Sequence, residues 1–174
     1  MIEVEIKAKI SDANEIRKII TKLGAAFKSK EIESDVYYNA PHKDFAETDE
    51  ALRIRTSSDI SMTYKGPKID SVSKSREEIY IILNDAKNAD LMLKALGFKE
   101  TATVRKMREI YTIDEITISI DAVDGIGEFI EIEILSDDYQ NSLDKVFGML
   151  ELLGLKRENT IRESYLELVL FKKS

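Results

Sequence analysis

Two stretches of the sequence carry carboxylates at every second position. The first nine residues read MIEVEIKAK, and a later stretch reads EFIEIEIL. Alternate side chains of a β-strand point to opposite faces, so Glu3 and Glu5 share one face of an early strand. Glu131 and Glu133 share a face of the later strand in the same way, with Ile residues on its other face. Carboxylates gathered like this suit a hard divalent cation such as Mg²⁺ or Mn²⁺.

Basic side chains alternate with aliphatic residues in other segments of the chain. They are Lys7, Arg53, Arg55, Lys65, Arg76, Lys106 and Arg108. For any single strand, a charged face turned to solvent is the ordinary arrangement. The alternation of charged and aliphatic residues recurs in many segments, and this favours a closed barrel instead. Its charged rows would line the inside, and its aliphatic rows would lie under helices. Charges out of water must be paired, hydrated or ligand-bound. A metal-chelated polyphosphate satisfies the carboxylates and the basic groups together, because Arg and Lys suit phosphate oxygens.

The elements that must position these residues follow from hydrophobic periodicity. Strands are expected at 2–10, 25–39, 51–56, 60–65, 74–83, 102–113, 116–123 and 128–135, and helices at 12–23, 86–96, 139–153 and 161–173. Many short alternating strands favour an antiparallel sheet or barrel over a parallel fold. We therefore expect an α+β fold, an eight-stranded antiparallel β-barrel with helices packed outside, in a single domain over 1–174.

Composition excludes several classes of protein. The 174 residues include no cysteine, so a disulfide scaffold and Cys-ligated metal sites are excluded. A net charge of −7 argues against a general nucleic-acid binder. No apolar run is long enough to span a bilayer, and the first expected strand leaves no room for a signal peptide. We expect a cytoplasmic protein that does not bind membranes.

Several motifs in succession resemble the CYTH superfamily, the triphosphate tunnel metalloenzymes. The first strand, EVEIK, matches the family signature E-x-E-x-K, and TDEALRIR, TYKGP, SREEI, KMREIY and DAVDGIGEFIEIE follow in the family's order over nearly the whole chain. The stretch YYNAPHKDFAETDEALRIR is most similar to the class IV adenylyl cyclase-like branch of bacteria and archaea. The resemblance implies an antiparallel barrel that forms a tunnel for a triphosphate with Mg²⁺ or Mn²⁺, and it makes a homodimer a further expectation.

Carried over by motif, the resemblance implies three sets of site residues. The metal set is Glu3, Glu5, Asp121, Glu131 and Glu133, with the last two as main ligands. The triphosphate-binding set is Lys7, Arg53, Arg55, Lys65, Arg76, Lys106 and Arg108. The catalytic set is Glu5, Lys7, Glu78 and Lys106. His42, the only histidine, lies in an expected loop, so proton handling is expected to fall to the metal, a carboxylate or a lysine.

The resemblance leaves the reaction open. A class IV adenylyl cyclase-like conversion of ATP to cyclic AMP and pyrophosphate is the leading prediction. Hydrolysis of the terminal phosphate of inorganic tripolyphosphate or thiamine triphosphate is the alternative, and a non-catalytic polyphosphate- or nucleotide-binding module is a weaker one. These activities differ in where the substrate stops in the tunnel, and no residue of the sequence fixes that position.

Overall fold

A computed structural model describes residues 2–68 and 76–173 of the chain. The strands are β1 (Ile2–Lys9), β2 (Ala26–Asn39), β3 (Ala51–Thr56), β4 (Ile60–Lys68), β5 (Arg76–Leu83), β6 (Lys99–Ile113), β7 (Ile116–Val123), β8 (Gly127–Ser136) and β9 (Thr160–Ile161). The helices are α1 (Ala13–Lys22), α2 (Ala86–Ala95), α3 (Tyr139–Leu152) and α4 (Tyr165–Lys173), with a single 3₁₀ turn, η1 (Arg157–Asn159). The expected strand over 74–83 is observed from its third residue, since its first two lie outside the described residues.

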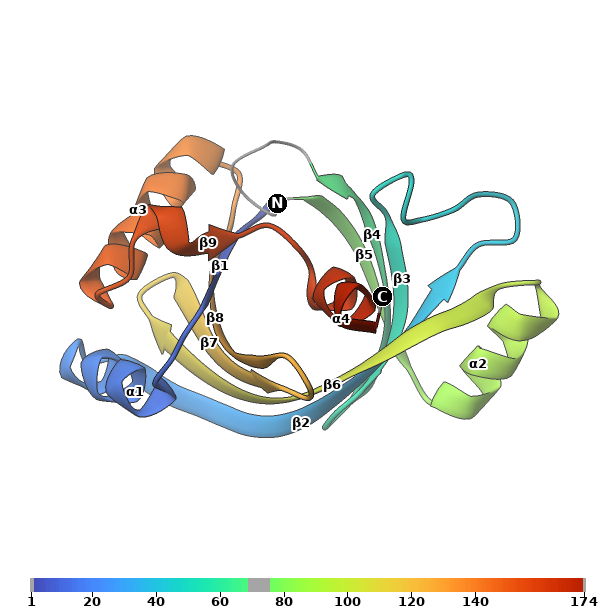
Figure 1. Cartoon of the computed structure of the whole chain (residues 1–174), viewed down its shortest axis with the longest axis horizontal. Helices are drawn as coiled ribbons and strands as arrows, with labels where there is room; N and C mark the ends of the chain where they lie inside the picture. The colour runs from blue at the N-terminus through green and yellow to red at the C-terminus, as the bar shows by residue number, and fades with distance from the viewer. Residues whose placement is uncertain (1, 69–75, 174) are drawn as a thin grey trace.

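The strands form one curled antiparallel sheet in the order β5-β4-β3-β2-β6-β7-β8-β1-β9. Figure 1 shows this sheet bent into a half-barrel around a central space. The α+β antiparallel fold predicted from the sequence is confirmed. Within the described residues no ladder pairing joins β5 to β1, and side chains bridge the two instead, through a hydrogen bond between Glu3 and Glu78.

Strand pairing brings the predicted charged residues opposite one another. Glu5 is paired with Glu133, and Lys7 with Glu131, across the β1–β8 ladder. The side chains of a directly opposed pair point to the same face of the sheet, so one register places all four on the concave side. The same geometry sets the Arg108 side chain of β6 beside the Asp121 side chain of β7.

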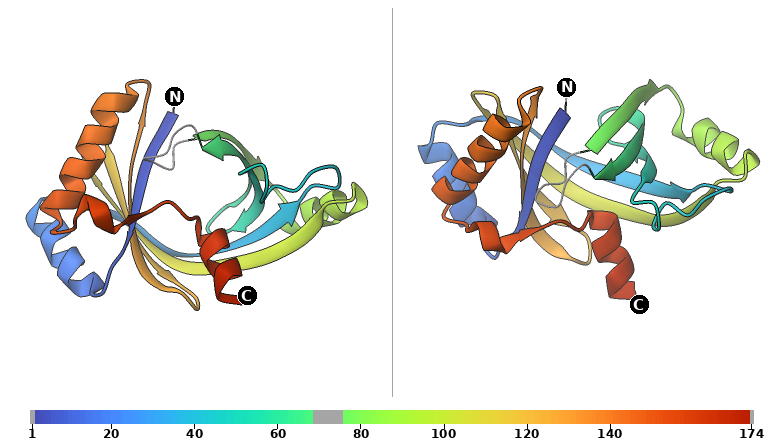
Figure 2. Two further views of the ribbon diagram at one scale, coloured as in Figure 1. Left: turned by 45° about the horizontal axis from the view of Figure 1, so that its top comes forward. Right: turned by 90° about the horizontal axis from the view of Figure 1, so that it is seen from above.

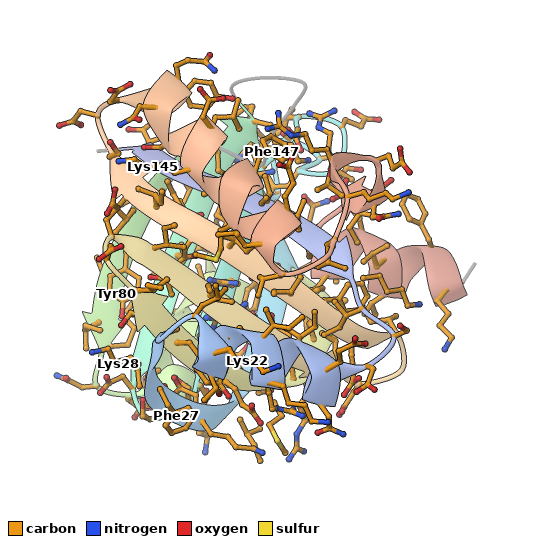
Figure 3. The ribbon with its side chains drawn as sticks, turned by 90° about the vertical axis from the view of Figure 1, so that its left-hand side faces the viewer. Lys22, Phe27, Lys28, Tyr80, Lys145 and Phe147 are labelled. Atoms are coloured by element: carbon orange, nitrogen blue, oxygen red, sulfur yellow. The ribbon has the colours of Figure 1, made fainter. Side chains whose placement is uncertain are left out.

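Helices α1 and α3 cover the convex face of one half of the sheet. Figure 3 looks onto this face, where the two helices cross the strands with the exposed Lys22 and Lys145 on their outer sides. Ile20 of α1 and Leu150 of α3 are fully buried, against Ile132 of β8. The aliphatic rows therefore lie between sheet and helices, as the alternation predicted.

Helix α2 packs over the convex face of the other half, with Leu93 buried against Tyr38 and Leu52. Asp85 precedes this helix and its side chain accepts a hydrogen bond from the backbone N–H of Asn88, which satisfies a donor that has no partner within the helix. No helix of the described residues is long and apolar enough to cross a membrane.

The C-terminal segment differs from its prediction. A helix was expected over 161–173, but Thr160 and Ile161 add a two-residue strand to the free edge of β1, and helix α4 begins only at Tyr165. The edge of β1 offers unpaired backbone groups, and pairing there overrides the local helical pattern. Figures 1 and 2 show α4 at one end of the curled sheet, over the central space.

Candidate functional site

A cavity of about 760 Å³ lies inside the curled sheet. Of the predicted site residues it is lined by Glu3, Glu5, Arg53, Arg55, Lys65, Arg76, Glu78, Lys106, Arg108, Glu131 and Glu133. The remaining two, Lys7 and Asp121, are fully buried beneath the lining. Residues from six strands that are far apart in the sequence thus meet around one space.

Three carboxylates gather on one side of the cavity. Glu3, Glu5 and Glu133 each offer an oxygen within 4.8 Å of the others. Burial and the neighbouring acids Glu5, Glu78 and Glu133 raise the pKa of Glu3 to about 9, although Lys65 opposes the change. Burial and Glu5 raise the pKa of Glu133 to about 7. Without a cation, this cluster therefore holds protons at neutral pH.

The donor set of this cluster fits a hard divalent cation. Mg²⁺ and Mn²⁺ prefer carboxylate oxygens, and a cation among them removes the repulsion that helps to raise the pKa values of Glu3 and Glu133. Glu3, Glu5 and Glu133 are therefore the residues that would hold such an ion. Two further residues predicted as metal ligands, Asp121 and Glu131, lie in a different environment, next to basic side chains.

The second cluster pairs these two acids with three basic groups. Arg108 donates to both Asp121, at 2.7 Å from Nε to Oδ1, and Glu131. Lys106 Nζ lies 3.2 Å from Asp121 Oδ2, and Lys7 Nζ lies 3.8 Å from Glu131 Oε1. Burial alone would raise the pKa of Asp121, but Arg108 and Lys106 hold it below its usual range. Burial and Arg108 together lower the pKa of Lys106. The carboxylates here act as counter-ions to a buried basic group.

A third cluster contains two acids that the sequence reasoning missed. Arg55 donates to both oxygens of Asp35, at 2.7 and 2.8 Å, and Arg53 donates to Oδ2 at 3.1 Å. Glu33 Oε2 lies 2.8 Å from Arg55 Nη1 and 3.2 Å from Lys106 Nζ. Burial would raise the pKa of Asp35, but the two guanidinium groups hold it well below its usual range. The alternation of acids in KEIESD of β2 was the signal that could have identified them.

The remaining predicted residues lie at the β4–β5 side of the cavity. Lys65 donates to Glu78 and keeps the pKa of this acid below its usual range, against the opposing effect of burial. Arg76 Nη2 lies 3.6 Å from Asp49 Oδ1, and Asp49 also accepts from Lys68 Nζ at 2.7 Å. Asp49 was not predicted, because it lies in a loop with no periodic pattern. His42 is exposed and does not line the cavity.

Comparison with known proteins gives this geometry its context. Residues 1–165 match the CYTH domain family. A Methanocaldococcus jannaschii protein named "putative adenylate cyclase" is 46% identical over 172 residues, which are 97% of this chain and 98% of the relative. The solved structure of the PH1819 protein from Pyrococcus horikoshii has a TM-score of 0.91 at 41% identity, covering 98% of this chain and 99% of its own. A Hippeastrum protein described as a "putative adenylyl cyclase" with a dominant triphosphatase activity shares the fold, with a TM-score of 0.69 at 16% identity, over 98% of this chain and 95% of its own.

Proposed function

The chain belongs to the CYTH domain family, and from this premise we propose that it is an enzyme that binds a triphosphate with a divalent cation in its tunnel. The observation that carries the proposal is the convergence of basic side chains from β3, β4, β5 and β6 with three close carboxylates on one cavity. A module that only binds polyanions has use for the basic groups. It has no use for three carboxylates that repel one another and the ligand.

Conversion of ATP to cyclic AMP is the reaction that we propose first, since a relative 46% identical is named "putative adenylate cyclase". The ribose 3′-oxygen forms a bond to the α-phosphorus, and the bond from this phosphorus to the bridging oxygen of the β-phosphate breaks. Pyrophosphate leaves with the bridging oxygen. The proton of the 3′-hydroxyl passes to a carboxylate, for which we propose Glu5, a buried residue that lines the cavity.

The basic residues stabilise the charge that develops on the leaving group. Lys106 is proposed to bind its oxygens, and Lys7, which lies beneath the lining, adds its positive charge. Arg53, Arg55, Arg76, Lys65 and Arg108 are proposed to hold the rest of the phosphate chain. Glu78 orients the ammonium group of Lys65, to which it is hydrogen-bonded. A divalent cation, held by Glu3, Glu5 and Glu133, supplies positive charge to the triphosphate oxygens when bound.

Hydrolysis is the second candidate, and one specific observation favours it. The Hippeastrum protein has the same fold and is described by a dominant triphosphatase activity. In this reaction a water oxygen forms a bond to the terminal phosphorus, and the bond from this phosphorus to the bridging oxygen breaks. Orthophosphate leaves, and the bridging oxygen stays with the rest of the chain. The same basic residues would serve both reactions, because both develop negative charge on phosphate oxygens.

Phosphorus NMR separates these candidates. The purified protein with Mg²⁺ or Mn²⁺ is given ATP, inorganic tripolyphosphate and thiamine triphosphate in parallel. Pyrophosphate together with cyclic AMP establishes a cyclase, and orthophosphate from any of the three establishes a triphosphatase. Tight binding without any product would leave only a binding module.

Substitution of one carboxylate tests the cation site in the same assay. Glu133→Gln is expected to abolish the metal-dependent turnover while the circular dichroism spectrum stays that of the wild type. Glu158→Gln, at an exposed position of η1, is the matched control and should keep full turnover. Full turnover by Glu133→Gln would contradict the assignment of this cluster.

A further inference from the structure

Tyr165, the first residue of α4, reaches from the end of the sheet into the basic cluster. Its side chain is buried, and its hydroxyl donates a hydrogen bond to Asp121 Oδ2 at 2.8 Å. Phe129 supports the ring edge-on, with ring centroids 5.2 Å apart at an interplanar angle of 65°. Helix α4, which lies at one end of the curled sheet (Figure 1), thus inserts one aromatic ring among the charged side chains of the cavity lining.

Two ammonium groups lie against this ring. Lys7 Nζ is 3.9 Å from the centroid of Tyr165, and Lys106 Nζ is 4.9 Å from it. Both distances fall within the roughly 6 Å over which an aromatic face attracts a cation. The attraction is strongest where water is excluded, and both lysines are almost completely buried.

The uncharged ring contacts these lysines in addition to the carboxylates that surround them. Lys106 Nζ lies 3.2 Å from Glu33 and 3.2 Å from Asp121, and Lys7 Nζ lies 3.8 Å from Glu131. These ion pairs offset part of the lysine charge, and Lys106 also donates a hydrogen bond to Asp121. An aromatic face attracts the ammonium through its quadrupole and carries no net charge, so the ring fixes the position of the two ammonium groups without neutralising them further.

We propose that Tyr165 is a positioning residue that holds two ammonium groups in place for a polyphosphate, that of Lys106 in the cavity lining and that of Lys7 just beneath it. This inference rests on the proposed function, because it takes the charges of the two lysines to attract the phosphate chain. The ring performs this role, and the hydroxyl contributes by fixing the orientation of Asp121. Without the ring, the neighbouring carboxylates alone hold the flexible lysine side chains, and we expect their ammonium groups to be less well placed for an incoming anion.

Isothermal titration calorimetry with inorganic tripolyphosphate in metal-free buffer tests the role of the ring. Tyr165→Leu is expected to weaken binding on the order of tenfold, which is about 1.4 kcal/mol and in the range of desolvated cation–π contacts. Tyr165→Phe keeps the ring and should stay within about twofold of the wild type. Wild-type affinity in a folded Tyr165→Leu protein would overturn the inference, and so would an equal loss in both variants, since the hydroxyl would then be responsible.

Tyr111 provides a matched control on the opposite face of the same sheet. It is as buried as Tyr165, its hydroxyl donates to Glu109 at 3.1 Å, and Phe27 packs edge-on against it at 5.4 Å. Tyr111→Leu removes a similar buried ring and hydrogen bond without touching the cavity, so it should leave tripolyphosphate affinity unchanged. An equal loss of affinity in Tyr111→Leu would show that general destabilisation explains the result, and it would overturn the inference.

Proton NMR gives a second readout that needs no ligand and no folded Leu variant. The ring current of Tyr165 should move the ε-methylene signals of Lys7 and Lys106 upfield in the wild type and in Tyr165→Phe. Unshifted signals in the wild type would overturn the inference by themselves. Upfield signals in a wild-type protein that binds no tripolyphosphate would retain the ring contact but refute the proposed function, and the anion-binding role with it.

Discussion

Removing the charge of either of two carboxylates at the candidate site should change the stability of the protein, in opposite directions for the two. Glu133 belongs to the cluster of three acids, where burial and Glu5 raise its pKa to about 7. Asp121 is fully buried and accepts hydrogen bonds from Arg108, Lys106 and Tyr165. The perturbations are therefore Glu133→Gln and Asp121→Asn, each in the metal-free protein.

The expected magnitude for Glu133→Gln depends on pH. Above pH 4.5 the unfolded chain ionises this acid, while the folded chain keeps it protonated up to about pH 7. Folding stability falls over this window, since the folded state binds more protons. A change of one in pKa corresponds to about 1.4 kcal/mol. The repulsion involves all the acids of this cluster, so removing one charge relieves only part of it. We therefore expect Glu133→Gln to stabilise the folded protein by on the order of 1–3 kcal/mol at pH 8. The substitution should have little effect at pH 4.5 or below.

The expected magnitude for Asp121→Asn is larger and has the opposite sign. Removal of one partner from a buried ionic network leaves buried charge uncompensated, at a cost of about 3–5 kcal/mol. For a chain of this size, 1 kcal/mol corresponds to roughly 2–4 °C in melting temperature. Asp121→Asn should therefore melt roughly 6–20 °C below the wild type. Its pKa is held low in the folded state, so the loss should be the same at pH 5 and pH 8.

Thermal unfolding followed by circular dichroism, in buffer with a metal chelator, measures both effects. The reasoning is refuted if Glu133→Gln lowers the melting temperature at pH 8. It is also refuted if Asp121→Asn leaves the melting temperature unchanged, because the basic cluster would then have no need of its counter-ion.

Three other predictions follow from the same geometry. Arg53→Ala should weaken tripolyphosphate binding by about 1.5–3 kcal/mol, as is typical of a charge-assisted hydrogen bond, and equal affinity by calorimetry would place its side chain outside the binding site. The metal-free protein should lose stability between pH 5 and pH 9, because the pKa of Glu3 is raised to about 9, and Glu3→Gln should reduce that loss; identical pH profiles of the melting temperature would contradict it. His42→Ala should leave turnover unchanged, since His42 is exposed outside the cavity, and a kinetic assay with a tenfold loss would give it a role in the reaction.

The sequence allowed the prediction of the strands and of the residues that face inward. Strict alternation in EVEIK and EFIEIEIL determines which side chains share a face, whatever the partner strand is. Glycines mark the ends of the first three helices: Gly24, Gly97 and Gly154 all have positive φ directly after the C-cap. These signals are local, and local signals are readable from one chain.

The different environments of the acidic side chains depend on the tertiary structure. Glu131 and Glu133 are two residues apart on one face of β8, and the sequence treats them alike. Pairing sets Glu133 opposite Glu5, whereas Glu131 lies opposite Lys7 and next to Arg108. One acid therefore joins a repulsive cluster and the other a neutralised cluster.

By itself, the sequence determined the faces of the strands, the charge types on them and the family to which they belong. Only the tertiary structure decided which charges meet, because strand order and register join segments more than a hundred residues apart. It also placed Tyr165 against Lys7 and Lys106, which are distant from it along the chain. Pairing with the edge of β1 keeps Thr160 and Ile161 extended. Helix α4 therefore begins only at Tyr165, whose ring lines the cavity. A cation–π contact leaves no periodic pattern in the sequence, because its partners come together only when the sheet curls.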